Sequence, residues 1–225
     1  LQHLARPPDG LIIASPSNPA GTMLPPEEVA AIARYCHEHG IRLISDEIYH
    51  GIHFAGPIAT ACAFSPSAIV INSFSKYFSM TGWRIGWMVL PEDLLRPVEC
   101  LAQNFFISAP HIAQVAAEAA FECAAELAAN VARYRRSRDL LLAALPDVGF
   151  PVLSPAEGAF YLFADVSSRT GDSAQFAARM LAEAGIATAP GIDFDGRRGR
   201  HFLRFSYCGP EADMAEAARR LASWR

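Results

Sequence analysis

The chain has 225 residues, enough for one large domain or two smaller ones. Its hydrophobic content of 52% and charged content of 19% are those of a globular protein and argue against disorder. The net charge of -4 argues against a nucleic-acid partner, and no apolar run is long enough to cross a membrane. The five cysteines are an odd number without C-x-x-C spacing, so we expect reduced thiols and a cytoplasmic protein.

The first hundred residues alternate short apolar runs with a helical pattern. Strands are predicted at residues 11–14, 42–45, 69–73 and 85–90. Between the first two, Pro25 and the acidic residues after it begin an apolar stripe that ends before Gly40, which predicts a helix. This order is typical of a parallel α/β sheet, and the continuous apolar strands indicate that both of its faces are covered.

The second half of the chain has a different pattern. A helix is predicted at 92–103, followed by a long helical zone at 110–145 that Pro146 ends. The elements predicted after it are strands at 160–166, 186–189 and 202–207 and helices at 173–184 and 210–224. We therefore expect an α/β domain over residues 1–120, and a connecting helix with a small α+β domain over residues 121–225.

Lys76 is the single lysine in a chain with eighteen arginines. It follows the predicted strand 69–73, in the segment Ser73-Phe74-Ser75-Lys76. Arginine can serve wherever a positive charge is enough, but it stays protonated and cannot attack a carbonyl carbon as an amine does. Lys76 is therefore a candidate for covalent chemistry, although an arginine-rich composition also leaves few lysines by chance.

Polar residues follow the first two predicted strands, at positions where ligands bind in open α/β sheets. Asn18 lies in a segment with prolines on both sides, which restrict its backbone. Asp46 and Tyr49 follow the strand at 42–45, and a carboxylate in that place needs a cation or hydrogen bonds. A plain connecting loop at Asn18 and a turn-capping role for Asp46 are the structural alternatives.

Two arginines are candidates for anion binding. Arg84, together with the hydroxyls of Ser73 and Ser75, suits a phosphate dianion because a guanidinium forms bidentate pairs with phosphate. Arg204 interrupts the apolar strand predicted at 202–207 and needs an anionic partner if it points inward. A small carboxylate ligand or an internal salt bridge would provide that partner.

In their order and spacing, these segments resemble the pyridoxal-phosphate-dependent aminotransferases of class I/II, which have the fold-type I scaffold. The shared motifs are N-P-x-G, D-x-x-Y, S-x-S-K with an arginine eight residues later, and an arginine in a late strand. The segment from Gly158 to Tyr161 is also similar to the family's active-site strand. The resemblance implies an α/β fold: part of a large cofactor-binding domain with a mostly parallel sheet flanked by helices, followed by a small C-terminal α+β domain.

The resemblance also implies a role for each candidate. Lys76 would be the catalytic residue, forming the internal aldimine with pyridoxal 5'-phosphate and then moving the α-proton of the substrate. Asp46 would pair with the ring nitrogen, and Arg204 would bind the substrate's α-carboxylate. The other cofactor contacts would be Asn18 and Tyr49 at the phenolic oxygen, and Ser73, Ser75 and Arg84 at the phosphate. The family's Asn-Pro bond is often cis, so we expect a cis bond between Asn18 and Pro19.

The implied activity is transfer of an amino group between an amino acid and a 2-keto acid, in a homodimer. The chain matches little more than half of the family's length, so we expect it to be N-terminally truncated and to bind the cofactor poorly on its own. Segment 103–110 has no arginine and two phenylalanines, which favours a neutral or apolar amino-acid donor over a dicarboxylate.

Two other functions fit the same motifs. One is a pyridoxal-phosphate-dependent C–S β-lyase, which releases ammonia and pyruvate. The other is the aminotransferase-like effector domain of a transcription regulator. The histidine pairs 37/39 and 50/53 lack the supporting acids or thiols of a metal site, so we expect no metal.

Overall fold

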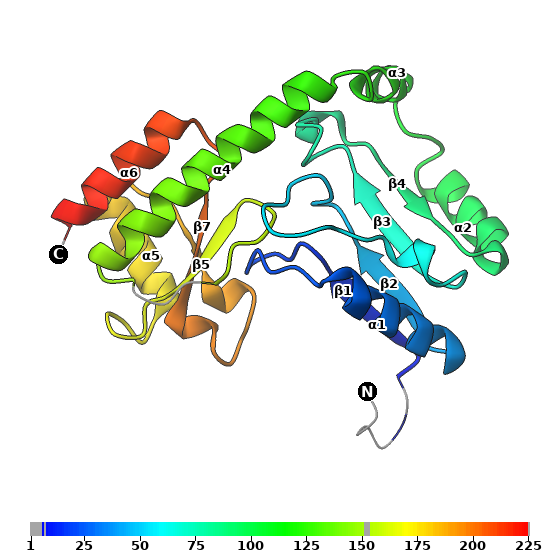
Figure 1. Ribbon diagram of the computed structural model, residues 1–225, viewed down its shortest axis with the longest axis horizontal. Helices are drawn as coiled ribbons and strands as arrows, with labels where there is room; N and C mark the ends of the chain where they lie inside the picture. Colours follow the sequence, from blue (N-terminus) through cyan, green and yellow to red (C-terminus); the bar gives the residue numbers. More distant parts are fainter. Residues whose placement is uncertain (1–5, 7, 151–153, 225) are drawn as a thin grey trace. The chain divides into compact units, whose positions relative to one another are not determined.

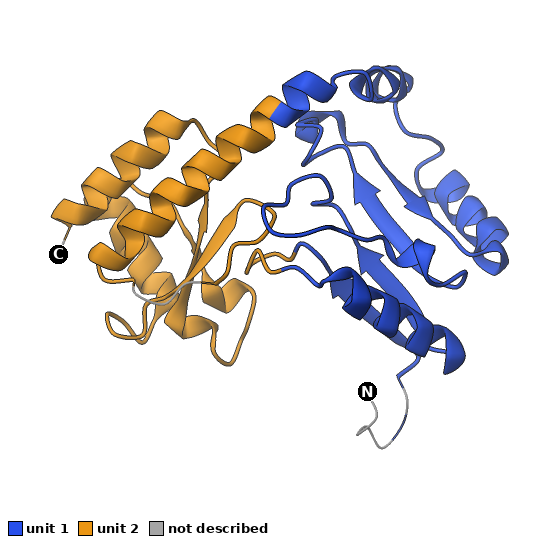
Figure 2. Ribbon diagram, viewed as in Figure 1, with its two compact units in different colours: residues 1–16, 23–128 blue, residues 17–22, 129–225 orange. Residues whose placement is uncertain are grey.

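The computed structural model describes residues 6, 8–150 and 154–224, and its elements are labelled in Figure 1. The chain divides into two compact units, shown in Figure 2. The first comprises the residues up to 16 and residues 23–128, and the second comprises residues 17–22 and those from 129 onward. The short segment 17–22 therefore belongs with the C-terminal part of the chain, although both of its neighbours belong to the first unit.

The first unit is built on a four-stranded sheet in the order β1-β2-β3-β4 (Figure 1). Its strands are β1 (Gly10–Ala14), β2 (Arg42–Asp46), β3 (Ile69–Ser73) and β4 (Gly86–Val89). The first three are parallel, and β4 runs antiparallel to β3. The expected mostly parallel sheet is confirmed, and each strand lies within one residue of its predicted bounds.

Helix α1 (Pro26–Glu38) packs on this sheet because its apolar stripe faces the strands. Val29, Ala33 and Cys36 of the helix form one buried cluster with Leu43 and Val70 of the sheet. Proline at the start of the helix and glutamates in its first turn match the predicted start signals. The other helical elements of this unit are η1 (Ala61–Ala63), η2 (Thr81–Trp83), α2 (Glu92–Phe105) and α3 (His111–Ala120).

The prediction of one continuous helical zone at 110–145 is wrong. The chain forms two separate helices there, α3 and α4 (Ala124–Asp147). Between them the backbone tightens: the N–H of Phe121 donates to the carbonyl of Glu118, and the N–H of Cys123 to that of Ala120. Phe121 also contacts Phe74 and Phe78, with ring centroids 5.5 and 5.3 Å away. The interruption thus brings an aromatic side chain onto the turn after β3.

Pro146 does not end α4, which is a second correction. The helix continues through Pro146 to Asp147. The cap that follows is formed at Gly149, whose φ of +94° is in the left-handed region. There the N–H of Phe150 donates to the carbonyl of Leu145 over 3.1 Å, the bond that closes a Schellman cap. A proline so near the end of the helix removes only a terminal hydrogen bond.

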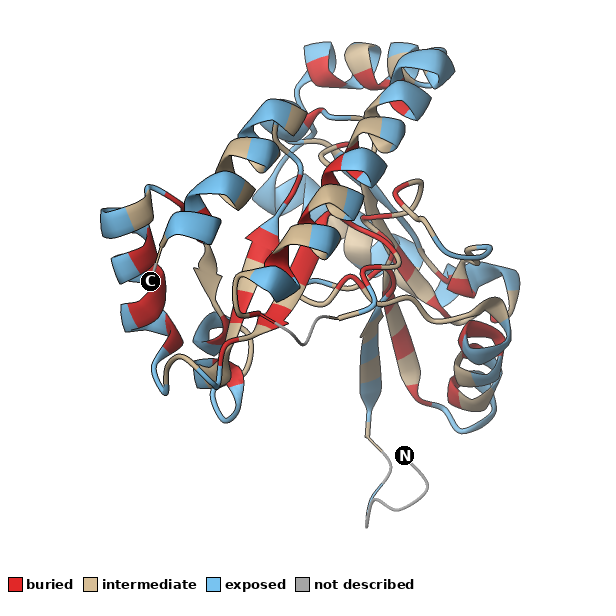
Figure 3. Cartoon of the chain, turned by 60° about the vertical axis from the view of Figure 1, so that its left-hand side comes forward, coloured by how far each residue is buried: buried red, intermediate tan, exposed pale blue. Residues whose placement is uncertain are grey.

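The second unit contains an antiparallel sheet in the order β5-β7-β6. Its strands are β5 (Tyr161–Asp165), β6 (Ala189–Pro190) and β7 (Phe202–Ser206). Its helical elements besides α4 are α5 (Ser173–Ala184), η3 (Gly191–Asp193), η4 (Gly199–His201) and α6 (Glu211–Ser223). Leu162, Leu203 and Leu221 are at most 2% exposed, and Figure 3 shows buried residues along these strands and on the inner helix faces.

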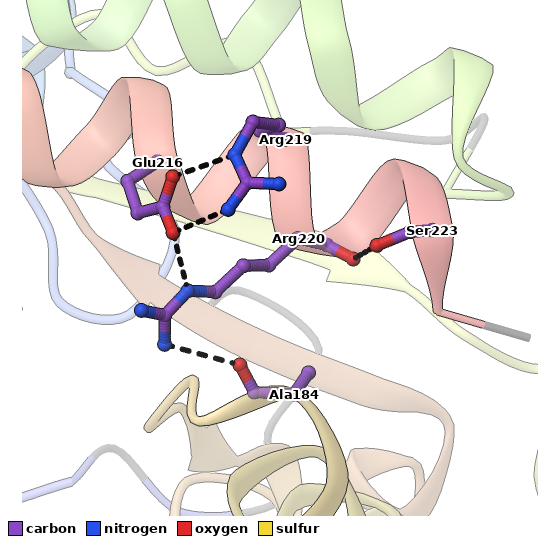
Figure 4. Close-up of polar contacts among 5 residues, drawn as sticks. All are labelled: Ala184, Glu216, Arg219, Arg220 and Ser223. Carbon is purple, nitrogen blue, oxygen red and sulfur yellow. Dashed lines mark hydrogen bonds and ion pairs between the residues drawn. The ribbon is translucent and has the colours of Figure 1, made fainter.

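Strand β6 starts three residues later than the strand predicted at 186–189. The reason is the end of α5, where Gly185 takes a left-handed conformation and the N–H of Ile186 donates to the carbonyl of Met180. Residue 186 is therefore part of the helix cap. Figure 4 shows that Arg220 of α6 also donates to the Ala184 carbonyl at this helix end, while Glu216 holds both Arg219 and Arg220.

The described part of the chain contains no helix long and apolar enough to cross a membrane.

Segment 17–22 is a tight loop that packs against residues 158–161. The peptide bond between Asn18 and Pro19 is cis, as expected. The loop is closed by a 2.9 Å hydrogen bond from the N–H of Ser17 to the carbonyl of Thr22 and by a 2.7 Å bond between their hydroxyls. Gly21 has a φ of +67°, and its carbonyl accepts from the N–H of Gly158 over 2.9 Å.

Replacing Gly21 with alanine is expected to destabilise the protein. A Cβ at Gly21 would lie 2.9 Å from the carbonyl oxygen of Gly158, and alanine is strained at this φ. We expect Gly21→Ala to lower the free energy of unfolding by about 1–3 kcal/mol, measured by urea denaturation. The control is Gly171→Ala, where the added Cβ meets nothing within 4 Å. Equal unfolding midpoints for the two variants would contradict the tight packing of this loop.

Candidate functional site

Three of the predicted cofactor residues lie at one edge of the sheet in the first unit. Asp46 is the last residue of β2 and Ser73 the last residue of β3. Because β4 is antiparallel to β3, Ser73 pairs with Gly86, and Arg84 comes just two residues before that position. Parallel strands end together, and an antiparallel neighbour begins where they end. The sheet topology therefore gathers these side chains from distant parts of the sequence.

The turn after β2 carries Asp46 and Tyr49 and is tied to both neighbouring strands. The N–H of Ser15 donates to the carbonyl of Asp46 over 3.2 Å, and the N–H of Glu47 donates to that of Ile71 over 2.9 Å. The carboxylate of Asp46 accepts from the N–H of Ile48 at 3.2 Å, and the side chain is partly buried. Tyr49 is only 3% exposed. Both side chains therefore start from a backbone that cannot shift easily.

Lys76 lies in the turn after β3, with its Nζ 5.7 Å from the centroid of the Tyr49 ring. The hydroxyl of Ser73 accepts from the N–H of Ser75 at 3.0 Å. The carbonyl of Lys76 accepts from the N–H of Ser79 at 3.1 Å, which closes the turn. The two turns also touch, because a Cβ at Gly51 would overlap the ring of Tyr77. The structure thus brings the lysine beside the tyrosine that follows Asp46.

Arg84 precedes β4 in a left-handed conformation, with a φ of +51°. Its Nη1 donates to the carbonyl of Thr81 at 2.9 Å, and the hydroxyl of Thr81 donates to the carbonyl of Ser75 at 2.8 Å. The side chain is exposed, and a guanidinium has several N–H groups, so most of its donors can serve an anion. A chain of hydrogen bonds thus connects Arg84 to the serine-containing turn.

The second unit holds the other two predicted residues, Asn18 and Arg204. Nη1 of Arg204 donates to Oδ1 of Asn18 over 2.7 Å. The guanidinium carbon lies 4.3 Å from the ring centroid of Tyr161 and 4.8 Å from that of Phe194. Nε of Arg204 is buried and has no hydrogen-bond partner among the described residues. No carboxylate of the described residues lies within ion-pair distance of Arg204.

The hydrogen bond from Arg204 also orients the amide of Asn18. Arginine can only donate, so the atom that faces it must be the amide oxygen. The amide nitrogen of Asn18 is then the group that remains as a donor, on an exposed side chain. This is the polarity needed to bind a phenolic oxygen.

Three residues near these sites were missed from the sequence. Phe194 covers the guanidinium of Arg204, but it follows η3 in a segment without a recognisable pattern. Glu47 is 2% exposed, and Nδ1 of His50 lies 3.4 Å from its Oε2. The available signal was the second acid of Asp46-Glu47, because a carboxylate so near an apolar strand needs buried partners.

No group of three histidine, cysteine or acidic side chains suited to a metal occurs in the described residues.

Comparisons with known proteins agree with this architecture. The family model described as aminotransferase class I and II matches residues 1–221. The chain is 50% identical to a valine–pyruvate aminotransferase of Mycobacterium tuberculosis, over all of this chain and 59% of that protein. It is 36% identical to an aspartate/prephenate aminotransferase of Thermus thermophilus, over 94% of this chain and 55% of that protein.

A solved structure shows the same fold. The crystal structure of an aminotransferase from Mycobacterium tuberculosis matches with a TM-score of 0.96 and 49% identity, covering all of this chain and 59% of that one. The chain thus spans somewhat more than half of the length of the relatives it matches. Because the family model covers nearly every residue, this chain belongs to the class I and II aminotransferases.

Proposed function

We propose that this chain carries the lysine, phosphate-binding and carboxylate-binding residues of a pyridoxal-phosphate-dependent aminotransferase. The observation that carries the proposal is the position of the single lysine. Lys76 lies beside Tyr49, on the sheet edge that also holds the anion Asp46 and the Ser73–Arg84 pair of phosphate ligands. The names of the relatives, which are aminotransferases, support the same reaction type.

The donor set fits pyridoxal 5'-phosphate. Asp46 would face the ring nitrogen as an anion, while the serine hydroxyls and Arg84 would bind the phosphate with neutral and charged donors. The amide nitrogen of Asn18 and the hydroxyl of Tyr49 would donate to the phenolic oxygen. When bound, the cofactor supplies an aldehyde that reacts with amines and a ring that withdraws electrons from the substrate.

The residues of this chain then have separate tasks. Lys76 would hold the cofactor through its amine, and it would act as the base that takes the proton from the substrate's Cα and later returns one. Asp46 keeps the ring nitrogen protonated, because a nearby anion favours the charged form. Arg204 orients the substrate by binding its α-carboxylate. Its Nε, which has no partner among the described residues, and the aromatic rings around its guanidinium support this role.

We propose a neutral or apolar amino acid as the donor. The segment 103–110 has no arginine that could bind a second carboxylate. Its Phe105 and Phe106 are 75% and 77% exposed, so apolar surface is available there. The name of the Mycobacterium tuberculosis relative, which refers to valine and pyruvate, supports this choice, whereas the Thermus thermophilus relative is named for aspartate and prephenate.

We also propose that the whole enzyme acts as a homodimer in the cytoplasm. Large apolar side chains on and after α2, which include Leu101 and Ile107 at 55% and 85% exposed, support contact with another polypeptide. The share of the relatives' length that the chain covers supports the expectation that it binds the cofactor weakly alone.

The single lysine allows a direct chemical test of the cofactor site. The chain is incubated with pyridoxal phosphate at high concentration, reduced with borohydride and digested, and the modified peptides are identified by mass spectrometry. We expect the label on Lys76, and its complete loss in Lys76→Arg, because a protonated guanidinium cannot react. The chain's α-amino group should be labelled equally in both proteins and is the internal control. Labelling of Lys76 that does not exceed the labelling of the α-amino group would overturn the assignment.

Arg204→Gln should weaken the use of amino-acid substrates. We expect the single-turnover rate of the cofactor-loaded protein with L-valine, at subsaturating concentration, to fall roughly ten- to a hundredfold, because a charged hydrogen-bond partner of the carboxylate is lost. The matched control is Arg200→Gln, an exposed arginine four residues earlier that contacts His201. Unchanged rates in Arg204→Gln would exclude the carboxylate role.

A panel of donors tests the substrate class. With the cofactor-loaded protein, we expect L-valine and L-alanine to convert the cofactor to its amine form faster than L-aspartate, because no arginine in segment 103–110 can bind a second carboxylate. The conversion is followed by absorbance at equal donor concentrations. Aspartate as the fastest donor would refute the proposal.

A further inference from the structure

A buried carboxylate, Glu47, lies directly beside Asp46 and is not used in the proposed reaction. It is 2% exposed. Its Oε1 accepts from the hydroxyl of Ser45 at 3.0 Å and from the N–H of Ala61 at 2.9 Å. Burying a carboxylate is costly unless hydrogen bonds and a cation compensate for the lost water. Glu47 thus joins β2 to the start of η1 and needs its remaining oxygen satisfied as well.

His50 supplies the contact for that oxygen. Its Nδ1 lies 3.4 Å from Oε2 of Glu47, and its side chain is 18% exposed. The N–H of His50 also donates to the carbonyl of Glu47 at 2.9 Å. The other ring nitrogen, Nε2, is buried without a hydrogen-bond partner among the described residues. The geometry thus places one of the two ring nitrogens of His50 against the carboxylate of Glu47.

Burial favours the neutral ring of His50 at neutral pH, against the effect of the nearby carboxylates. Burial lowers the pKa of His50 below its ordinary value of 6.5, and His53 lowers it further. Glu47, the backbone of Ser15 and Asp46 act in the opposite direction. His50 follows Asp46 by four residues in the same turn, so a positive charge on His50 would act on the residue assigned to the cofactor's ring nitrogen.

We propose that Glu47 and His50 form a positioning pair that holds the Asp46–Tyr49 turn and makes cofactor binding depend on pH. The carboxylate of Glu47 ties the turn to Ser45 and Ala61 through hydrogen bonds. The imidazole ring of His50 is the group of the pair whose protonation changes with pH. This inference rests on the proposed function, because it assumes that Asp46 receives a cationic ring nitrogen. A protonated His50 would compete with that ring nitrogen for the negative charge of Asp46, so acid would weaken cofactor binding.

The linkage is reciprocal. If protonation of His50 weakens binding of the cofactor, the bound cofactor must lower the pKa of His50 by the same coupling. Stability follows the same sign. A histidine with a lowered pKa in the folded state stabilises the fold fully above about pH 6.5, and this contribution is lost as the pH falls through the folded-state value.

The first experiment needs no cofactor. The titration of His50 is followed by NMR of its ring nitrogens, with the signal assigned by its absence in His50→Asn. We expect a midpoint below the ordinary histidine value of 6.5, a still lower midpoint in Glu47→Gln and a smaller decrease in Asp46→Asn, because Glu47 is the larger of the two influences. The matched control for Glu47 is Glu28→Gln on the exposed side of α1, which should leave the midpoint unchanged. A midpoint indifferent to Glu47→Gln would overturn the pair.

The second experiment measures the affinity for pyridoxal phosphate between pH 5 and 8 by fluorescence titration. We expect affinity to fall with acid in the wild type and to be much less pH-dependent in His50→Asn, whose amide can still donate to Glu47. Glu47→Gln should weaken binding roughly tenfold at pH 7.5, because a buried charged partner is lost. Equal pH profiles for wild type and His50→Asn would refute the proposal, whether or not Glu47→Gln folds.

The two experiments also separate this inference from the proposed function. If borohydride labels no lysine but Glu47→Gln still shifts the His50 titration, the cofactor role fails and the buried pair stands. If Lys76 is labelled but neither variant changes the titration or the pH profile, the aminotransferase assignment stands and the positioning pair is rejected.

Discussion

The pairing of β3 with β2 on one side and β4 on the other is the constraint on which the first unit's site depends. The parallel register with β2 brings the ends of both strands to one edge, and the antiparallel register with β4 returns the chain to it. Asp46, Ser73 and Arg84 reach this edge only through those backbone hydrogen bonds. A one-residue slip of any strand would turn its side chains to the opposite face. The apolar packing between α1 and the sheet fixes the register, and it therefore also fixes the positions of the site residues.

Most of the fold could be predicted from the sequence, and the exceptions have physical causes. The strands were found from their continuous apolar runs, and α1 from the proline and acids at its start. The expectation that both faces of the sheet are covered is wrong for this chain, because Ile12 of β1 is 71% exposed and Met88 of β4 is 50% exposed. The interruption at 121–123 could not be found, since it depends on the contact of Phe121 with Phe74 and Phe78, which are distant in sequence. The prediction that Pro146 ends the long helix was wrong because a proline in the last turn of a helix disturbs few hydrogen bonds. The helix ends at Asp147, and Gly149 forms its cap.

Those site residues could be predicted whose chemistry alone requires one residue type. The residues whose role depends on what surrounds them in the folded structure could not be predicted. A lone lysine among arginines and an arginine in an apolar strand stand out in any sequence. Glu47 and Phe194 do not, because an acid in a D-x-x-Y segment and a phenylalanine in a loop have many uses. Their importance depends on what surrounds them: hydrogen bonds from Ser45 and Ala61 in one case, and the guanidinium of Arg204 in the other.

The membership of residues 17–22 in the second unit has a consequence for how this protein can be divided. The chain passes between the two units at three points, so no single cut separates them into complete folded parts. A polypeptide that begins at residue 129 would contain Arg204 but lack Asn18, the amide to which that guanidinium donates. No continuous segment of the chain can therefore contain both Arg204 and Asn18 without also containing residues 23–128 of the first unit.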